Sequence, residues 1–361
     1  MKILSVLGAR PQFIKAAPVS RALEAQAELC EIIVHTGQHY DRNMSELFFE
    51  EMRIPRPKYN LGVGSASHAV QTAKMLPQLE SVVLEEQPDW MLVYGDTNST
   101  LAAALVAAKM HVPIAHVEAG LRSHNRRMPE EVNRVVADHL SSMLFAPTKT
   151  AVRNLLREGV DETAIHHVGD VMLDASLHFR QVAERESNIL ANMQLTPRSY
   201  CLATIHRAEN TSDAAVLKEL LDILRALSRT LPVVLPLHPR TRDAVRQFGL
   251  EKSLEGITHV VEPVGFLDIM MLESAAALIV TDSGGMQKEA YFFHVPCVTL
   301  RAETEWTELV ECGFNFLAGG SRDVALRVAQ QALAAKPDWS IQLYGAGDAS
   351  RRIASLLARQ K

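Results

Sequence analysis

Short, mainly apolar runs alternate with longer segments of helical periodicity along most of the chain. In the first half the apolar runs fall at 3–7, 32–35, 91–94, 114–117 and 143–146, and helical patterns fall at 14–25, 68–86 and 100–109. Runs this short and this apolar predict strands that are buried on both faces. Their alternation with helices predicts a parallel sheet covered by helices on both sides.

A second series of the same kind begins near residue 200. Its apolar runs fall at 200–204, 233–236, 258–261, 278–281 and 297–300, and its helical patterns at 214–230, 266–275 and 286–293. The sequence therefore predicts an α/β protein with two parallel-sheet domains, divided within a polar helical segment. We place the domains at 1–172 and 173–347. We expect the amphipathic stretch 348–361 to pack back on the first domain.

Composition narrows the class of protein. The 361 residues are 47% hydrophobic and 22% charged with a net charge of −5, which argues against a disordered chain and against a nucleic-acid-binding surface. The apolar runs are far shorter than the roughly 20 residues of a membrane helix, and the first residues lack a signal-peptide pattern. No CxxC pair occurs, so we expect a cytoplasmic protein with these cysteines reduced: Cys30, Cys201, Cys297 and Cys312.

Carboxylates at three places in the chain carry the most informative chemistry. Asp96 and Glu118 each follow an apolar run, whereas Glu130 and Glu131 open a helical pattern after Pro129. Ligands of parallel sheets bind beyond the carboxyl ends of the strands, where converging carboxylates can transfer protons. A structural alternative is open for three of them. Asp96 could cap the next helix, and Glu130 and Glu131 could stabilise a helix dipole.

A phosphate group would suit the segment after the run 278–281. Ser283, Gly284 and Gly285 lie between that run and a helix, where free N–H groups and the helix dipole favour an anion. Glu289 lies one turn further along, where a carboxylate could hold ribose hydroxyls. The alternative is an ordinary tight turn, which also needs glycine.

The first turn offers a second anion site. Arg10 and Lys15 flank a predicted helix start, and two cations there suit a diphosphate. A solvated arginine and a mid-helix lysine are the alternative. With one candidate in each half, the two segments together predict a diphosphate ligand in an interdomain cleft.

Histidines follow two strands of the second half. His206 and Arg207 come directly after the run 200–204, and His238 follows the next run. A histidine can donate to a leaving phosphate or shuttle a proton. The alternative is that these side chains bond the start of a helix.

The usual cofactor motifs are missing from the sequence. No GxGxxG follows the first strand and no GxxxxGK[ST] occurs, which argues against nicotinamide cofactors and P-loop nucleotide hydrolysis. His35 and His39 are four apart, but Gly37 lies between them, so ordinary loop histidines are favoured over a zinc site.

Six motifs in order resemble the non-hydrolysing UDP-N-acetylglucosamine 2-epimerases. They are GARP at 8–11, YGDTNST at 94–100, HVEAGLR at 116–122, PEEVNR at 129–134, HRAEN at 206–210 and DSGGMQKEA at 282–290. The resemblance spans residue 3 to about residue 317 and implies a GT-B-like fold of two Rossmann-like domains around a central cleft. It implies inversion at sugar carbon 2 by elimination and re-addition of UDP, with no cofactor and no metal. A homodimer is expected from the resemblance alone.

The resemblance also implies roles for individual residues. Asp96, Glu118 and Glu130 are expected to be the catalytic carboxylates, with His206 aiding the departure of UDP. The expected UDP and substrate contacts are Arg10, Lys15, Arg207, His238, Ser283, Gly284, Gly285, Glu289, Arg301 and Glu305.

Two departures from the family pattern bear on the substrate. Trp306 follows Glu305 where many members have arginine, and Gln38-His39 is followed by Tyr40–Ser45 rather than a shorter acidic pattern. Strong allosteric activation by UDP-N-acetylglucosamine is therefore not expected. Both features resemble the branch that acts on UDP-2,3-diacetamido-2,3-dideoxy-glucuronate for O-antigen mannuronates. Arg126 and Arg127 are candidate partners for a uronate, with solvated loop arginines as the alternative.

The substrate stays open between that uronate and UDP-N-acetylglucosamine. Three further functions also remain: a UDP-sugar glycosyltransferase of the same fold, a non-catalytic nucleotide-sugar sensor, and a hydrolysing 2-epimerase that releases free UDP.

Overall fold

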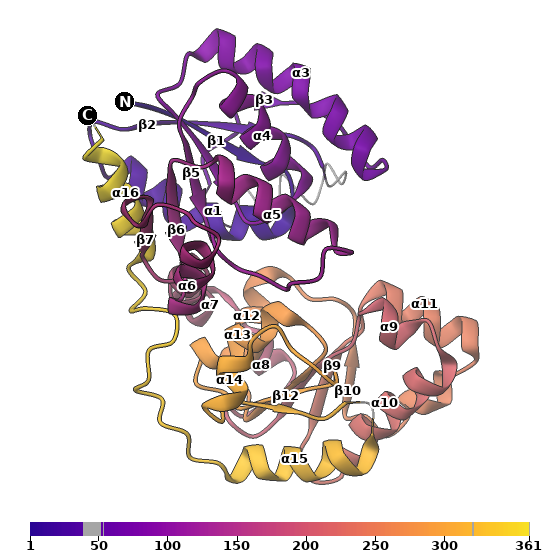
Figure 1. Cartoon of the computed structure of the whole chain (residues 1–361). Helices are drawn as coiled ribbons and strands as arrows, with labels where there is room; N and C mark the ends of the chain where they lie inside the picture. Colours follow the sequence, from indigo (N-terminus) through magenta and orange to yellow (C-terminus); the bar gives the residue numbers. More distant parts are fainter. Residues whose placement is uncertain (39–51, 53, 320, 361) are drawn as a thin grey trace. The chain divides into compact units, whose positions relative to one another are not determined.

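The computed structural model describes residues 1–38, 52, 54–319 and 321–360, and it divides the chain into two compact units (Figure 1). The first unit comprises Met1–Ala175 and Gln342–Lys361, and the second comprises Ser176–Ile341. Helix α7 (Val171–Glu186) runs from one unit into the other. The chain therefore passes between the units twice.

The first unit is built on a seven-stranded parallel sheet in the order β3-β2-β1-β4-β5-β6-β7. The strands are β1 (Lys2–Leu7), β2 (Cys30–His35), β3 (Tyr59–Asn60), β4 (Trp90–Tyr94), β5 (Ile114–Val117), β6 (Met143–Ala146) and β7 (Ile165–His167). The helices are α1 (Arg10–Glu24), α3 (His68–Glu86), α4 (Asn98–Lys109), α5 (Pro129–Leu140), α6 (Lys149–Arg157) and α16 (Ala349–Ala358), with a 3-10 turn at Glu162–Ala164.

The second unit has a six-stranded parallel sheet in the order β10-β9-β8-β11-β12-β13. The strands are β8 (Cys201–Thr204), β9 (Val233–Pro236), β10 (His259–Val261), β11 (Leu278–Thr281), β12 (Cys297–Thr299) and β13 (Asn315–Leu317). The helices are α8 (Ile189–Asn192), α9 (Ala208–Thr211), α10 (Ala214–Leu227), α11 (Pro239–Phe248), α12 (Phe266–Ala275), α13 (Gly284–Phe292), α14 (Thr307–Glu311) and α15 (Arg322–Ala334), with a 3-10 turn at Glu251–Leu254.

Both sheets follow the Rossmann strand order, so the direction of winding reverses between β1 and β4 and again between β8 and β11. Ligands of such sheets bind at the carboxyl ends of the strands beside this reversal. The predicted α/β class with two parallel-sheet domains is confirmed. The segments that follow β1, β4, β8 and β11 are therefore the places to look for function.

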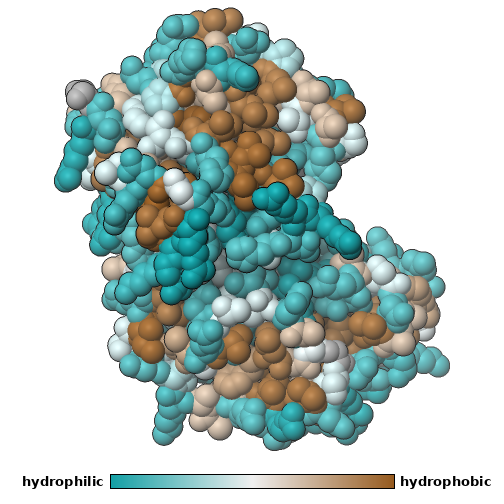
Figure 2. All heavy atoms as spheres, in the orientation of Figure 1, coloured by the Kyte–Doolittle hydropathy of each residue, from teal (hydrophilic) through white to brown (hydrophobic). Residues whose placement is uncertain are grey.

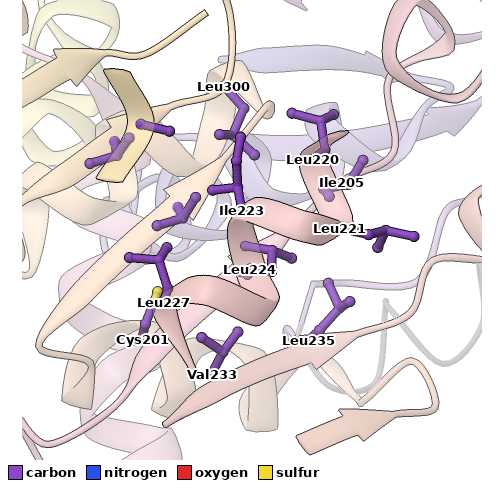
Figure 3. Packing of buried hydrophobic residues seen from close by; sticks show 14 of the residues in the cluster. Cys201, Ile205, Leu220, Leu221, Ile223, Leu224, Leu227, Val233, Leu235 and Leu300 are labelled. Carbon is purple, nitrogen blue, oxygen red and sulfur yellow. The ribbon is translucent and has the colours of Figure 1, made fainter. Parts of the chain in front are cut away.

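The core of the second unit shows why its apolar runs form strands. Figure 3 shows leucines of α10, among them Leu224, on the side of the helix that faces Cys201 of β8 and Val233 of β9. All three of these side chains are fully buried. Burying one leucine stabilises the fold by about 1.5–3 kcal/mol, so α10 and the sheet hold each other in place.

Helix α1 begins four residues earlier than the helical pattern predicts. The Oε1 atom of buried Gln12 accepts hydrogen bonds from the N–H groups of Gly8 (2.8 Å) and Ala9 (3.1 Å). Pro11 in the first turn fits a helix start because its missing N–H would have no partner there. Capping by Gln12 and Pro11 thus brings Arg10 into the helix.

Helix α16, shown in yellow in Figure 1, packs against α1 of the first unit. Its first turn is held by Asp174, whose carboxylate accepts the N–H (2.8 Å) and hydroxyl (2.5 Å) of Ser350. Within the described part of the chain, no helix combines the length and the apolar character that a membrane span requires.

Candidate active site

The carboxyl ends of three neighbouring strands in the first unit carry two of the predicted carboxylates. Strands β1, β4 and β5 are adjacent in the sheet; Asp96 lies just after β4 and Glu118 just after β5. Lys15 of α1 forms an ion pair with Glu118, and their side chains are only 13% and 9% exposed. The lysine and the carboxylate that were assigned from separate motifs therefore lie together.

Gly95 makes room for this ion pair. A Cβ atom on Gly95 would lie 3.1 Å from Lys15 Nζ and 3.4 Å from Glu118 Oε2, and the residue has a φ of +60°. Both the space and the left-handed backbone favour glycine. The loop after β4 thus passes directly beside the Lys15–Glu118 pair.

Glu118 has a backbone conformation that is unusual for a residue with a side chain. Its φ of +71° lies in the left-handed region, which costs a non-glycine residue roughly 1–2 kcal/mol. The N–H groups of Glu118 (3.2 Å) and Ala119 (3.1 Å) both donate to the carbonyl of Phe145 on β6 and hold the turn. Strain maintained by such contacts is typical of functional positions.

Asp96 does not cap the helix that follows it. The cap of α4 is Thr97, whose Oγ1 accepts the N–H of Thr100 at 3.3 Å. The Asp96 carboxylate instead forms an ion pair with Arg134 of α5, and its side chain remains 31% exposed. The capping alternative is therefore wrong, and the carboxylate is held by a cation in a partly open position.

The two glutamates at the start of α5 have different surroundings. Glu131 is buried and accepts hydrogen bonds from the N–H and hydroxyl of Ser123 (2.9 and 3.0 Å) and from the N–H of His124 (2.9 Å). Burial would raise the pKa of Glu131, but these bonds and Arg134 outweigh burial and lower it. Glu131 thus anchors the preceding loop, whereas Glu130 is exposed at the helix start.

In the second unit, buried Asp282 organises the turn after β8. Its carboxylate accepts the N–H groups of His206 and Arg207 (both 3.0 Å) and the side-chain amide of Asn210 (3.0 Å). The Nδ1 atom of His206 lies 3.1 Å from Asp282 Oδ1, and the imidazole is 36% exposed. Burial would raise the pKa of Asp282, but bonds from His206, Arg207 and Asn210 outweigh burial and lower it.

His238 lies beside His206. The two rings are 5.4 Å apart, and His238 caps α11 by accepting the N–H of Arg240 at 3.2 Å. The guanidinium of Arg240 donates to the carbonyl of His206 at 3.3 Å. Both predicted histidines therefore lie at the ends of the neighbouring strands β8 and β9, and the helix-capping alternative holds for His238.

The glycine turn before α13 lies against a cluster of charged side chains. Ser283 caps α13 by accepting the N–H of Met286 at 3.4 Å. A Cβ atom on Gly284 would lie 2.3 Å from Glu305 Oε1, so a side chain there would displace the Glu305 carboxylate. Glu305 pairs with Arg301 at 2.9 Å and lies 3.8 Å from a guanidinium nitrogen of Arg207.

The chain is similar to known proteins along nearly its whole length. Residues 21–358 match the family described as UDP-N-acetylglucosamine 2-epimerase. A Pseudomonas aeruginosa protein named UDP-2,3-diacetamido-2,3-dideoxy-D-glucuronate 2-epimerase is 50% identical over 99% of this chain and 100% of its own length. The chain belongs to the UDP-N-acetylglucosamine 2-epimerase family. A Methanocaldococcus jannaschii UDP-N-acetylglucosamine 2-epimerase is 44% identical over the full length of both chains.

Solved structures of the UDP-N-acetylglucosamine 2-epimerase family share the fold. The M. jannaschii enzyme in complex with UDP-GlcNAc and UDP has a TM-score of 0.88 and 44% identity, covering 99% of this chain and 100% of its own. The Neisseria meningitidis enzyme bound to UDP-GlcNAc has a TM-score of 0.87 and 30% identity, with full coverage of both chains. The predicted GT-B-like fold is thereby confirmed.

Trp306, the departure from the 2-epimerase family pattern, holds the glycine turn. Its indole N–H donates to the carbonyl of Gly284 at 2.9 Å, and Lys288 Nζ lies 4.3 Å from its ring centroid. Thr304 also binds Gln287 of α13 at 2.6 Å. The face of the indole therefore holds the cation of Lys288 near the turn, whereas an arginine at position 306 would itself carry the positive charge.

The structure gives the location and exposure of the remaining predicted residues, and their roles stay predictions. Arg10 is the exposed first residue of α1, Gly285 is exposed in the first turn of α13, and Glu289 is partly exposed further along it. Arg126 and Arg127 are exposed. The pattern at 39–45 lies outside the described residues.

Sequence reasoning did not assign a role to three polar residues of this 2-epimerase. Arg134, His116 and Asp138 contact the loops that carry Asp96 and Glu118. His116 lies in a fully buried strand, where a polar residue requires partners. That single polar position in an apolar run was the available signal.

Proposed function

We propose that the protein inverts carbon 2 of a UDP-linked 2-acetamido sugar. The observation that carries the proposal is the pairing of Asp96 and Glu118 with cations at the ends of adjacent strands. Carboxylates held in this way are available for proton transfer rather than for capping. The second unit supplies the histidine, arginines and helix start that suit a diphosphate leaving group.

The proposed reaction proceeds by elimination and re-addition. One carboxylate takes the proton from carbon 2 while the bond from carbon 1 to the UDP oxygen breaks, which gives a 2-acetamidoglucal and UDP. A second acid group delivers a proton to the opposite face of carbon 2, and UDP adds back at carbon 1. His206 and the cations around Glu305 would stabilise the charge on departing UDP.

We propose UDP-2,3-diacetamido-2,3-dideoxy-glucuronate as the preferred substrate. The 50% identity to a relative with that name supports this choice over UDP-N-acetylglucosamine. Exposed Arg126 and Arg127, shortly before Glu130, could bind the uronate carboxylate. The product would serve as a precursor of surface polysaccharide.

The decisive assay supplies both UDP-sugars in parallel in deuterated water. The expected result is faster turnover of the diacetamido-uronate, with deuterium at carbon 2 of recovered substrate and product. Recovered sugars without deuterium would refute epimerisation by this route. Accumulation of free UDP would identify a hydrolysing enzyme, and sugar transfer to an added acceptor would identify a glycosyltransferase.

Two variants separate the enzyme from a nucleotide-sugar sensor. In Asp96→Asn and Glu118→Gln, turnover should fall while UDP binding is retained, because the proposed UDP contacts of the second unit are unchanged. A sensor would bind UDP-sugar without turning it over and would be indifferent to both substitutions.

We propose that the protein acts as a homodimer through its first unit. Apolar residues gather over α4 and α5 in Figure 2, and Val132 of α5 is 45% exposed. Val132→Glu should shift the mass measured by light scattering from dimer to monomer. Leu333→Glu is the matched control, since Leu333 is 46% exposed but belongs to the second unit. We also propose a cytoplasmic location, which the free cysteines support.

A further inference from the structure

A fully buried histidine connects the two loops that carry Asp96 and Glu118. His116 lies in β5, and neither its side chain nor that of its partner Asp138 is exposed. One ring nitrogen, Nε2, lies 2.7 Å from the carbonyl oxygen of Gly95, and the other, Nδ1, lies 2.7 Å from Asp138 Oδ1. The histidine thus touches the residue directly before Asp96.

The partners of the ring fix its hydrogens. A carbonyl oxygen only accepts, so Nε2 must donate to Gly95. The other oxygen of Asp138 accepts hydrogen bonds from the Arg122 guanidinium at 2.7 Å and from the N–H of Gly120 at 3.1 Å, and this pairing holds the carboxylate in its ionised form. An ionised carboxylate also only accepts, so Nδ1 must donate as well. Both ring nitrogens therefore carry hydrogen, and the ring is an imidazolium.

The charges around the imidazolium are balanced. The second oxygen of Asp138 accepts from Arg122 at 2.7 Å, and Arg122 continues to Glu158 through bonds of 2.7 and 2.6 Å. This series of four contacting side chains therefore contains two cations, His116 and Arg122, and two anions, Asp138 and Glu158. Removing one of these side chains would leave an uncompensated charge inside the first unit and would destabilise the fold.

The same carboxylate holds the loop after β5. Asp138 Oδ2 accepts the N–H of Gly120 at 3.1 Å, two residues after Glu118. Gly95, Glu118 and Gly120 all have positive φ values of 60°, 71° and 81°. Because such turns are strained or glycine-dependent, their geometry needs restraint from outside the turn. His116 restrains the β4 loop directly and the β5 loop through Asp138.

We propose that His116, as an imidazolium, is a positioning residue that sets the carboxylates of Asp96 and Glu118 for proton transfer. This role rests on the proposed epimerase function. The histidine does not touch substrate; it acts through Gly95 and, with Asp138, through Gly120. A misplacement of about 1 Å can lower a rate roughly 10²-fold, so the expected effect is on kcat.

The test compares His116→Gln with His166→Gln. Glutamine cannot reach both partners, so His116→Gln should lower kcat by roughly 10²-fold while KM and the Kd for UDP change less than about twofold. His166 is the control because it is also a strand histidine of this sheet, but it lies on edge strand β7 and packs on Phe145. Its variant should retain wild-type kcat. Equal losses in both variants would overturn the proposal.

A combined variant distinguishes positioning from general damage. If His116 acts through Asp96 and Glu118, then adding His116→Gln to Asp96→Asn/Glu118→Gln should slow the reaction little further, because both groups that it positions are already disabled. Multiplicative losses would contradict the proposal. Wild-type protein without turnover on either UDP-sugar would instead refute the epimerase function itself.

A measurement on the wild-type protein covers the case in which the variant fails to fold. The ring nitrogens of a ¹⁵N-histidine-labelled sample should give two His116 resonances close together, as expected for two protonated nitrogens. If His116→Gln is insoluble, the His116 signals can be assigned in the wild type through the slow solvent exchange of its ring N–H hydrogens, since the side chain is fully buried. Two widely separated resonances would mean a neutral ring and would overturn the imidazolium.

Discussion

Replacing Asp282 with asparagine tests the link between a buried carboxylate and His206. An asparagine oxygen can still accept from His206 N–H, Arg207 N–H and Asn210, which all approach Asp282 Oδ2. Its amide then faces Nδ1 of His206, where the carboxylate faced it at 3.1 Å. A donor in that place forces Nδ1 to accept, so the imidazole must be neutral with its hydrogen on Nε2.

The cost in stability follows from the number of bonds. Hydrogen bonds to a charged group contribute about 1.5–3 kcal/mol and neutral ones about 0.5–1.5, so three weakened bonds lose about 3 kcal/mol. Easier burial of the neutral amide offsets part of this. We therefore expect Asp282→Asn to lower the unfolding free energy by about 2 kcal/mol at neutral pH.

The pH dependence has a definite sign. The folded-state pKa of Asp282 is lower than its ordinary value, so its stabilising contribution is present above about pH 4 and is lost as the pH falls through the folded-state pKa. Urea unfolding at pH 7.5 and below pH 4 should show the difference between wild type and Asp282→Asn shrinking in acid. A difference that stays constant would refute the assignment of an ionised Asp282.

Activity gives the second readout of the same variant. Loss of the hydrogen on Nδ1 of His206, which faces Asp282, should lower kcat by about 10²-fold or more, the usual contribution of a positioned acid or base. The Kd for UDP should change far less. A variant with wild-type kcat would show that the hydrogen on Nδ1 of His206 does not matter for the departure of UDP.

Three further predictions concern separate parts of the molecule. Glu130→Gln should lower kcat without changing the urea midpoint. Glu131→Gln should instead lower the unfolding free energy by about 2–4 kcal/mol, because Glu131 is buried and accepts hydrogen bonds from several donors. Equal urea unfolding curves for the two variants would contradict these different roles. Trp306→Ala removes the bond to Gly284 and should raise KM for the UDP-sugar about tenfold, which is about 1.4 kcal/mol, with steady-state kinetics as the measurement. Leu224→Ala, at a fully buried position, should cost about 2–5 kcal/mol in urea unfolding, and a loss below 1 kcal/mol would mean that the core repacks.

The sequence predicted the buried strands because these are the segments with a continuous apolar signal. Strands such as β4 and β11 are buried along their whole length. The edge strands β3, β7 and β13 were not predicted. They have only two or three residues each and are partly exposed, so their pairing is set by the neighbouring strand rather than by their own residues.

Site residues were predictable where a motif places them at the end of a strand. Their ion-pair and hydrogen-bond partners were not predictable where these partners lie far away in the sequence. Asp96, in the turn after β4, was identified, but Arg134, which pairs with it, lies 38 positions away on α5. Thr97, rather than Asp96, caps α4 because its side chain reaches Thr100. Periodicity reports on burial and not on which polar side chains meet, so ion pairs of this kind escape it.

The position of α16 determines the order in which the two units can complete their folding during translation. The helix belongs to the first unit and is capped by Asp174, yet the ribosome makes it after the whole of the second unit. The second unit is one continuous stretch of chain and can complete its core as soon as it has emerged. Of the two units, the one whose translation begins first is therefore the last to be completed, because the surface of α1 that α16 covers stays open until Ala349–Ala358 has been translated.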